Sequence, residues 1–409
     1  MIQTMILSAA MFAVLLIPTT NVLAQPNAFK DRQAVVNGNN DFAYDLYKEL
    51  RENEGNLFFS PYSISTALGM TYAGARAETA EQMANTLHFP LKQKRLHPAF
   101  KQITGLLNAQ GKQRPYELSV ANALWGQKGF SFLPEFIETT RQDYDAGFAE
   151  LDFVNESEKA RQTINKWVEG KTNDKIKDLI PKGVLNEDTR LVLTNAIYFK
   201  SAWAQEFFKA QTKQEPFLVS GKTSVKVPMM HKGEKLNYMQ TDEFQLVNIP
   251  YQGQQLSMIV VLPKSEKEFS GVENSLTNAN LNKWLRASKL HIVDLKLPKF
   301  KVTDEISLKK YLSKMGMPLA FSNQANFSGM TSEERVKIDE VLHKAFVDVH
   351  EKGTEAAAAT AVIIAKVTAI LNPKLPPRAN FHADKPFMFL IRENRTGSIL
   401  FMGRVNDPR

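Results

Sequence analysis

The stretch Glu351-Lys352-Gly353-Thr354-Glu355-Ala356-Ala357-Ala358-Ala359-Thr360 changes from charged to uncharged, and no charged residue follows Glu355 until Lys366. Its alanines are typical of a helix, whereas residues 361–365 are small or β-branched and apolar. One interpretation is therefore a short helix that runs into a buried strand. Residues 368–377 contain three prolines, however, which exclude regular structure there and indicate an exposed loop.

An exposed, uncharged and strand-prone segment is an aggregation hazard unless the protein uses it. Small side chains alternate along one face of this segment, at Thr354, Ala356, Ala358 and Thr360. A strand with such a face would slide between two existing strands with little steric resistance. The segment therefore predicts a strand that forms on demand.

Three further motifs lie in order around this stretch. They are Asn56-Leu57-Phe58-Phe59-Ser60-Pro61-Tyr62-Ser63-Ile64-Ser65, Leu193-Thr194-Asn195-Ala196-Ile197-Tyr198-Phe199-Lys200 with Trp203, and Phe381-His382-Ala383-Asp384-Lys385-Pro386-Phe387-Met388-Phe389. With the stretch itself, these segments resemble the motifs of the serpin family over essentially the whole mature chain. The resemblance implies an α+β serpin fold with three β-sheets, about eight to nine helices, and an exposed reactive-centre loop at about residues 351–380.

Local patterns agree with a chain that mixes helices and strands. Phe42, Leu46 and Leu50 recur every four residues and predict an amphipathic helix. The apolar runs 191–199 and 256–262 have the length and composition of buried strands.

Two more elements are expected towards the C-terminus. The runs 387–391 and 399–402 flank a polar turn and predict a hairpin in the core. A helix is expected to begin near Thr303 and Asp304, which would serve as N-caps, and to end at Gly316.

The composition is that of a globular protein, with 43% hydrophobic and 23% charged residues among 409. The absence of cysteine excludes disulfide frameworks, catalytic thiolates, cysteine-based zinc sites and iron–sulfur clusters. The 51 Lys and Arg residues outnumber the 43 Asp and Glu residues, which gives a formal charge of +8.

The N-terminus is typical of a secretory signal peptide. Residues 5–17 form an apolar run that is too short to span a bilayer, and the small-residue pattern Val22-Leu23-Ala24 predicts cleavage after Ala24. We therefore expect residues 1–24 to be removed and residues 25–409 to form one secreted, extracellular domain. Three sequons then become candidate glycosylation sites, at Asn155, Asn326 and Asn394.

No catalytic signature accompanies these features. The seven histidines form no HExxH pair, and the chain has no GxSxG elbow. We therefore expect no enzyme, no catalytic residue, no metal site and no required cofactor. A secreted hydrolase is the alternative from another class, and turnover of ester and peptide substrates would test it.

The resemblance also assigns roles to individual residues. Ser60, Ser63, Asn195 and His343 match the shutter, a polar cluster under the main sheet. Trp203, Lys299 and Glu351 match the breach, the point of loop entry, where an ion pair between Lys299 and Glu351 is expected. The family's inhibitory hinge matches Glu351, Gly353, Thr354, Glu355, Ala356, Ala357, Ala358, Ala359 and Thr360.

The function that the resemblance implies is suicide-substrate inhibition of a serine protease. The protease attacks the loop and forms an acyl-enzyme, and the cleaved hinge then inserts into the main sheet and distorts the attached protease. The alternative within the family is a serpin that does not inhibit and acts as a carrier, chaperone or storage protein. The small hinge residues favour inhibition.

Two counts for the position of the attacked bond disagree. Sixteen residues after Glu351 is Val367, whereas counting back from Pro386 leads to residues 372–375, which include Lys374. Trapping requires a taut tether, and moving the bond from Val367 to Lys374 would add about 23 Å of slack at about 3.3 Å per residue. We therefore favour a bond beside Val367, either Lys366–Val367 or Val367–Thr368. Lys366 would select trypsin-like proteases, and Val367 would select elastase-like ones. We favour Lys366, because a long basic side chain suits a deep acidic specificity pocket.

Basic residues form two clusters that the resemblance links to heparin binding. The first comprises Lys92, Lys94, Arg95, Lys101, Lys112 and Arg114, and the second comprises Lys283, Arg286 and Lys289. Solvated helix faces commonly carry this much charge, although the net charge of +8 also suits a heparin-like glycosaminoglycan. The basic residues lack interleaved aromatics, so nucleic acid is not expected as a partner; a membrane is not expected either. We expect a monomer that forms a covalent complex with its target protease.

Overall fold

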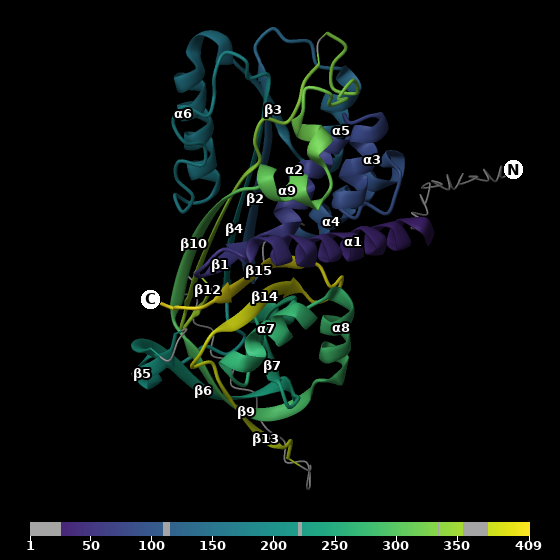
Figure 1. Ribbon diagram of the computed structural model, residues 1–409. Coiled ribbons are helices and arrows are strands. Elements are labelled where there is room, and N and C mark those ends of the chain that lie inside the picture. Colours follow the sequence, from purple (N-terminus) through teal and green to yellow (C-terminus); the bar gives the residue numbers. More distant parts are fainter. Residues whose placement is uncertain (1–25, 109–114, 220–222, 334, 355–374) are drawn as a thin grey trace, which may run out of the picture.

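The computed structural model describes residues 26–108, 115–219, 223–333, 335–354 and 375–409 (Figure 1). Within these residues the chain forms nine α-helices and two hydrogen-bonded β-sheets. The helices are α1 (Pro26–Leu50), α2 (Pro61–Tyr72), α3 (Ala77–Thr86), α4 (Gln93–Asn108), α5 (Pro134–Tyr144), α6 (Phe153–Lys171), α7 (Glu266–Ser275), α8 (Asn278–Ala287) and α9 (Lys309–Met315). None of the helices in the described part is long and apolar enough to cross a membrane.

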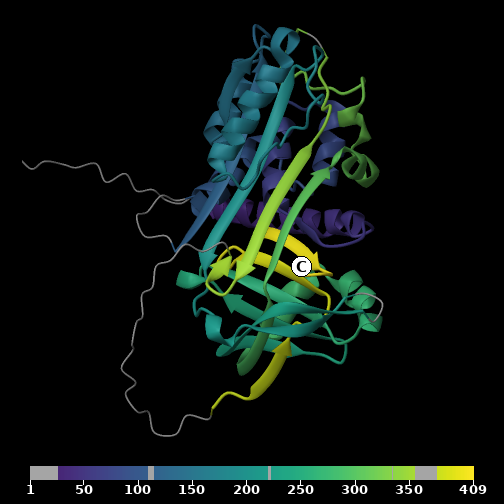
Figure 2. The ribbon, with the colours of Figure 1, turned by 90° about the vertical axis from the view of Figure 1, so that its left-hand side faces the viewer.

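The smaller sheet has six strands, in the order β10-β11-β12-β4-β2-β3. These strands are β10 (Phe300–Ser307), β11 (Leu342–His350), β12 (Gly353–Thr354), β4 (Leu191–Ala202), β2 (Tyr116–Gln127) and β3 (Gly147–Leu151). Figure 2 looks towards this sheet, where the teal strand β4 and the yellow-green strand β11 run side by side. Figure 1 shows α6 on one side of the sheet, with α2, α3, α4 and α5 on the other.

The pairing between β11 and β4 is much shorter than the pairing on either side of it. β2 and β4 are antiparallel over eleven pairs, and β10 and β11 are antiparallel over eight. β11 and β4, by contrast, pair directly only at Lys344 with Ala196 and at Ala345 with Ile197, in parallel orientation. The sheet is therefore weakly joined between these two strands.

The larger sheet has nine strands, in the order β1-β15-β14-β8-β7-β6-β9-β13, with β5 paired to β6. They are β1 (Leu57–Phe59), β15 (Ile399–Val405), β14 (Phe387–Glu393), β8 (Leu256–Pro263), β7 (Phe244–Pro250), β6 (Ser224–Gln240), β9 (Lys289–Pro298), β13 (Arg378–His382) and β5 (Lys213–Leu218). The 17-residue strand β6 pairs with β5 and β9 along part of its length and with β7 at its end. Hydrogen bonding through β6 therefore joins two of the three expected sheets into one.

Helix α2 lies buried between the two sheets and supports the weak join. All twelve of its residues are buried, as expected for a helix that is surrounded by protein. Ser60 caps its N-terminus by accepting a hydrogen bond from the Ser63 N–H, and Pro61 takes the first helical position, where no N–H is needed. The cap fixes the direction in which Ser60 and Ser63 meet the six-stranded sheet.

Most of the predicted elements are present, and one is wrong. Helix α1, the strands β4 and β8, and the hairpin of β14 and β15 cover the predicted ranges. Thr303 and Asp304, by contrast, are not N-caps but lie within β10, because eight consecutive pairs with β11 extend this strand as far as Ser307. Helix α9 begins only at Lys309 and ends before Gly316, whose positive φ of 128° suits glycine.

Candidate functional site

The hinge begins as a short strand between the C-terminal ends of β11 and β4. In β12, Gly353 pairs with His350 of β11 and Ala202 of β4, while Thr354 pairs with Val349 and Ser201. Glycine is required at 353, since its φ is 154° and a Cβ there would lie 2.1 Å from the Ser201 carbonyl oxygen. The remaining hinge residues, Glu355, Ala356, Ala357, Ala358, Ala359 and Thr360, lie outside the described residues, as do Lys366, Val367, Thr368 and Lys374.

The side chain of Thr354 points into the core behind the sheet. It is 1% exposed, and its hydroxyl lies 2.7 Å from the hydroxyl of Tyr251. Because side chains alternate along a strand, every second residue beyond Thr354 would point the same way in a longer β12. The predicted face of small side chains is thus the face that would enter the core.

The three breach residues lie together around the turn that precedes β12. Lys299 Nζ is 3.0 Å from a carboxylate oxygen of Glu351, so the expected ion pair is present. The Thr212 hydroxyl donates to the other carboxylate oxygen at 3.0 Å. Partial burial would raise the pKa of Glu351, but a main-chain hydrogen bond, Lys299 and Thr212 together hold it below its usual value.

Trp203 binds the same turn through both its main chain and its side chain. Its indole N–H donates to the carbonyl of His350, and its main-chain N–H donates to the carbonyl of Lys352, each at 3.0 Å. Its ring stacks on Tyr251 with the ring centres 4.6 Å apart and the planes 9° from parallel. Tyr251, which the sequence did not single out, therefore links Trp203 to Thr354.

β11 and β4 do not pair directly between β12 and their two direct pairs, and this stretch is here called the opening. The shutter residues meet at the end of the opening away from β12, beside those two pairs. The Ser60 N–H donates to Nε2 of His343 at 3.0 Å, and the Ser63 hydroxyl donates to Oδ1 of Asn195 at 2.5 Å. The amide of Asn195 in turn donates to Oδ1 of Asn122, at 2.7 Å. The cluster thus connects α2 to β11, β4 and β2.

One ring proton of His343 has no hydrogen-bond partner among the described residues. Burial lowers its pKa to about 3, so the imidazole is neutral at physiological pH. Because Nε2 accepts a hydrogen bond from Ser60, the proton must be on Nδ1. Nδ1 is buried and has no hydrogen-bond partner among the described residues. As far as the described residues go, the shutter therefore contains an unsatisfied donor, which costs free energy.

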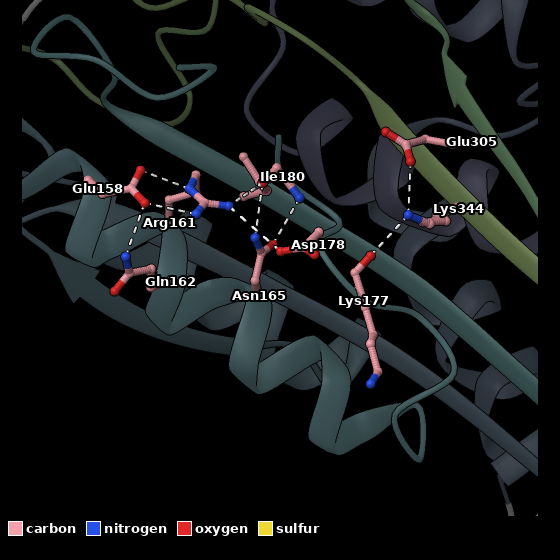
Figure 3. Close-up of polar contacts among 9 residues, drawn as sticks. All are labelled: Glu158, Arg161, Gln162, Asn165, Lys177, Asp178, Ile180, Glu305 and Lys344. Carbon is pink, nitrogen blue, oxygen red and sulfur yellow. Dashed lines mark hydrogen bonds and ion pairs between the residues drawn. The ribbon is translucent and has the colours of Figure 1, made fainter. Parts of the chain in front are cut away.

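A clamp that the sequence did not predict joins α6 and the segment after it to β11 and β10 (Figure 3). Asn165 of α6 exchanges two hydrogen bonds of 2.9 Å with the main chain of Ile180, which fixes the segment 172–190 to this helix. Lys344 of β11 then donates to the main-chain oxygen of Lys177 at 3.0 Å and pairs with Glu305 of β10 at 2.9 Å. The segment after α6 is thereby tied to the strand that borders the opening.

The candidate glycan and heparin residues lie away from this opening. Asn155 and Asn394 are exposed, whereas Asn326 is partly buried. Lys92, Lys94, Arg95 and Lys101 are exposed on or just before α4, and Arg95 pairs with Asp31; Lys112 and Arg114 lie outside the described residues. Lys283, Arg286 and Lys289 are exposed around the end of α8. No three acidic or histidine side chains in the described ranges are arranged to hold a metal.

Comparison with known proteins agrees with this arrangement. The family model described as serpin (serine protease inhibitor) matches residues 37–408. Human leukocyte elastase inhibitor is 40% identical over 381 residues, which cover 90% of this chain and 98% of that protein. The structure of human thyroxine-binding globulin with its ligand has 34% identity and a TM-score of 0.81, covering 92% and 99% of the two chains. Uncleaved ovalbumin has 26% identity and a TM-score of 0.80, covering 92% and 100%.

Proposed function

Because the chain belongs to the serpin family, we propose that it inhibits a serine protease by inserting its cleaved loop as a strand between β11 and β4. The observation that carries the proposal is β12, which already pairs with both of these strands in the orientation that an inserted strand would have. The related proteins include one named as an elastase inhibitor and one solved with thyroxine. Family membership alone is therefore compatible with protease inhibition and with carrying a ligand. The choice between the two functions rests on whether the hinge can insert.

The register of β12 predicts where the inserted residues would lie. Antiparallel partners step in opposite directions, so four residues beyond Thr354, residue 358 would lie between Ala345 and Ile197. These two residues now pair directly with each other. Insertion must therefore break the direct join of β11 and β4 and replace it with two longer ladders.

Two residues further, Thr360 would reach the shutter. The same register places it between His343 and Asn195, on the face that Thr354 already directs into the core. Its hydroxyl would then be placed to accept the unpartnered Nδ1 proton of His343. Insertion would satisfy a donor that the native state leaves buried, which favours the inserted state and supports a metastable native one.

The target is a trypsin-like protease if Lys366 occupies its specificity pocket. The taut-tether argument keeps the attacked bond beside Val367, and the elastase inhibitor among the relatives supports Val367 as the alternative. To test this, the protein is mixed with trypsin or with elastase, and a denaturing gel shows whether a covalent complex forms. The C-terminal peptide that is released is then sequenced from its N-terminus. A peptide that starts at Val367 identifies Lys366, and one that starts at Thr368 identifies Val367.

Carriage without inhibition predicts a different outcome. In that case both proteases cut the loop and are released as active enzymes, and the cut protein unfolds at the same temperature as the intact protein. Such a result would mean that the hinge does not insert. Inhibition predicts instead that the cut protein unfolds at a higher temperature, because insertion adds hydrogen-bonded ladders on both sides of the new strand. This comparison needs no knowledge of the natural target.

The proposal includes secretion as a glycosylated monomer. Helix α1 begins at Pro26, so removal of residues 1–24 would take nothing from a described element. Nδ2, the atom that would carry a glycan, is hydrogen-bonded in both exposed sequons. In Asn155 it donates only to the side chain of Asp152, three residues earlier on the surface, at 3.1 Å. In Asn394 it donates to Gln254 at 2.8 Å and to Ser257 at 2.9 Å, which belong to a distant segment, so Asn155 is the favoured site. N-terminal sequencing and glycopeptide mapping of the exported protein test both points.

We expect a glycosaminoglycan partner to bind the second basic cluster rather than the first. Arg95 in the first cluster is already paired with Asp31 by two hydrogen bonds. Lys289 lies instead on a groove of about 490 Å³ that also includes Arg378 and no acidic residue. The test measures the salt concentration at which variants elute from heparin-agarose. Changing Lys283, Arg286 and Lys289 to alanine should lower this concentration more than changing Lys92, Lys94 and Lys101 to alanine.

A further inference from the structure

Lys232 of β6 is a buried lysine close to the breach. Its side chain is 2% exposed, and its ammonium forms an ion pair with Glu234 at 2.7 Å. It also donates to the main-chain oxygen of Gln205 at 2.5 Å and lies 4.4 Å from the centre of the Phe207 ring. Burial lowers the pKa of Lys232, and Glu234 opposes that change. Lysines are almost never buried to this extent unless they are paired, and these partners account for the burial of Lys232.

The partners of Lys232 belong to a segment that grips the hinge. Residues 203–212, here called the clasp, connect β4 to β5. Trp203, Phe207 and Thr212 of the clasp donate four hydrogen bonds of 2.9 to 3.0 Å to the turn at residues 350–352. Gln205, which accepts from Lys232, lies between two of these donors. Lys232 therefore holds the clasp from the side opposite the hinge.

A line of direct contacts continues from Lys232 to β12. The Lys232 ammonium lies 6.0 Å from the centre of the Trp203 ring, within the range of a cation–π interaction. Trp203 stacks on Tyr251, and the Tyr251 hydroxyl lies 2.7 Å from that of Thr354. Each contact in this series is made directly between two side chains that the structure describes.

We propose that Lys232 is a positioning residue for loop insertion, which holds the clasp so that the turn before β12 keeps the geometry of a started strand. The inference rests on the proposed function, since positioning matters only if the hinge inserts. Insertion of the cleaved loop competes with hydrolysis of the acyl-enzyme. A loosened clasp lets the turn open, slows the entry of the next residues, and increases the share of protein that is cut without trapping the protease.

A purely structural role predicts something different. Replacing a buried ion pair with neutral side chains of similar size is often neutral or stabilising, because the cost of desolvating both charges disappears. The double variant Lys232→Met with Glu234→Gln removes both charges and leaves no unpaired carboxylate. If Lys232 only supports the fold, this variant keeps its stability and its inhibition together.

The test measures the stoichiometry of inhibition and the amide hydrogen exchange of residues 203–208 in the double variant. We expect about threefold more inhibitor per protease and about tenfold faster exchange in the clasp, with a midpoint of thermal unfolding no lower than that of the unmodified protein. Lys235→Met is the matched control, because Lys235 lies on the same strand and is exposed. The control should change neither quantity.

Two outcomes separate this inference from the function on which it rests. Unchanged exchange in the clasp, or an unchanged stoichiometry with faster exchange, overturns the role of Lys232. If the unmodified protein traps no protease, the proposed function fails, and the exchange measurement still decides whether Lys232 holds the clasp. Lys232→Arg, which keeps a cation but not its compact shape, should restore part of the exchange protection if the charge is what holds the clasp.

Discussion

The two ends of the opening between β11 and β4 are closed in different ways. At the breach end, β12 already separates the strands and pairs with both of them. At the shutter end, the strands pair directly at two positions, over a buried polar cluster fixed by α2. In the proposed insertion, the breach is thus already arranged for the new strand, whereas the direct pairs at the shutter would have to break.

This difference indicates where the free energy of the native state is held. We expect the proposed insertion to keep the breach contacts, because it would lengthen β12 beyond Thr354 and leave the turn at residues 350–352 in place. The shutter holds a buried donor on His343 that has no partner in the described part of the chain, and the proposed insertion would supply one. We therefore expect changes at the breach to alter how insertion begins and changes at the shutter to alter the stability of the closed sheet.

The largest expected effect follows from a bulky charge on the inward face of β12. Thr354→Arg would bury a guanidinium beside Tyr251, where the threonine is 1% exposed, so the hinge would leave the sheet and insertion would stop. We expect the stoichiometry of inhibition to rise by at least roughly tenfold, so that the protein behaves as a substrate. Titration of protease activity and a denaturing gel measure this change.

Lys352→Arg is the control for that substitution. Lys352 is exposed two residues earlier, and only its main-chain oxygen contacts Trp203, so an arginine there should leave the complex unchanged. Equal complex formation by Thr354→Arg and the unmodified protein would contradict the proposed insertion.

At the shutter, Asn195→Ala should destabilise the closed sheet. The change removes the acceptor of the Ser63 hydroxyl and the donor to Asn122, and both groups are buried. Two buried groups without partners cost about 2 to 6 kcal/mol together. Urea unfolding should show this loss, and Asn237→Ala, an exposed change on β6, should not. A shared midpoint for both variants would show that the shutter does not hold the sheet.

The depressed pKa of His343 predicts a loss of native stability in acid. The native group has a pKa of about 3, while the unfolded one has about 6.5, so the native state binds fewer protons between these values. The stabilising contribution is complete above pH 6.5 and is lost as the pH falls towards 3, by up to about 1.4 kcal/mol per pH unit. Between pH 7 and pH 5, the unfolding free energy should therefore fall by roughly 2 kcal/mol more in the unmodified protein than in His343→Gln. Equal slopes would contradict a buried neutral histidine.

The sequence predicted the members of the breach and the shutter better than it predicted how they are connected. Trp203, Lys299 and Glu351 meet as the motifs implied, since each is carried by an element with a strong local pattern. Asn122, Tyr251 and Lys232 were missed, because their roles depend on which strands become neighbours. Asn122, for example, contacts Asn195 only because β2 and β4 pair in that register.

The wrong helix start at Thr303 and Asp304 has the same cause. Both residues suit an N-cap, but pairing with β11 continues through them and outweighs the local preference. Similarly, nothing in residues 355–374 alone could predict that β12 would already have begun at Gly353. That feature depends on the close approach of Gly353 to the Ser201 carbonyl, which is a tertiary contact.

The smallest expected effect concerns the ion pair of the breach and tests whether that end is held by charge or by the clasp. Lys299 is 36% exposed, and partly exposed pairs contribute about 0.2 to 1 kcal/mol. Glu351→Gln keeps an acceptor for Thr212 and leaves the main-chain bond from Phe207, so the unfolding free energy should fall by less than about 1 kcal/mol. Unfolding in low and high salt measures this, because only the ion-pair contribution is screened. If the free energy of unfolding falls as much as in Asn195→Ala, the ion pair, and not the hydrogen bonds of the clasp, holds the turn before β12 in place. The contrast between the two ends of the opening would then disappear.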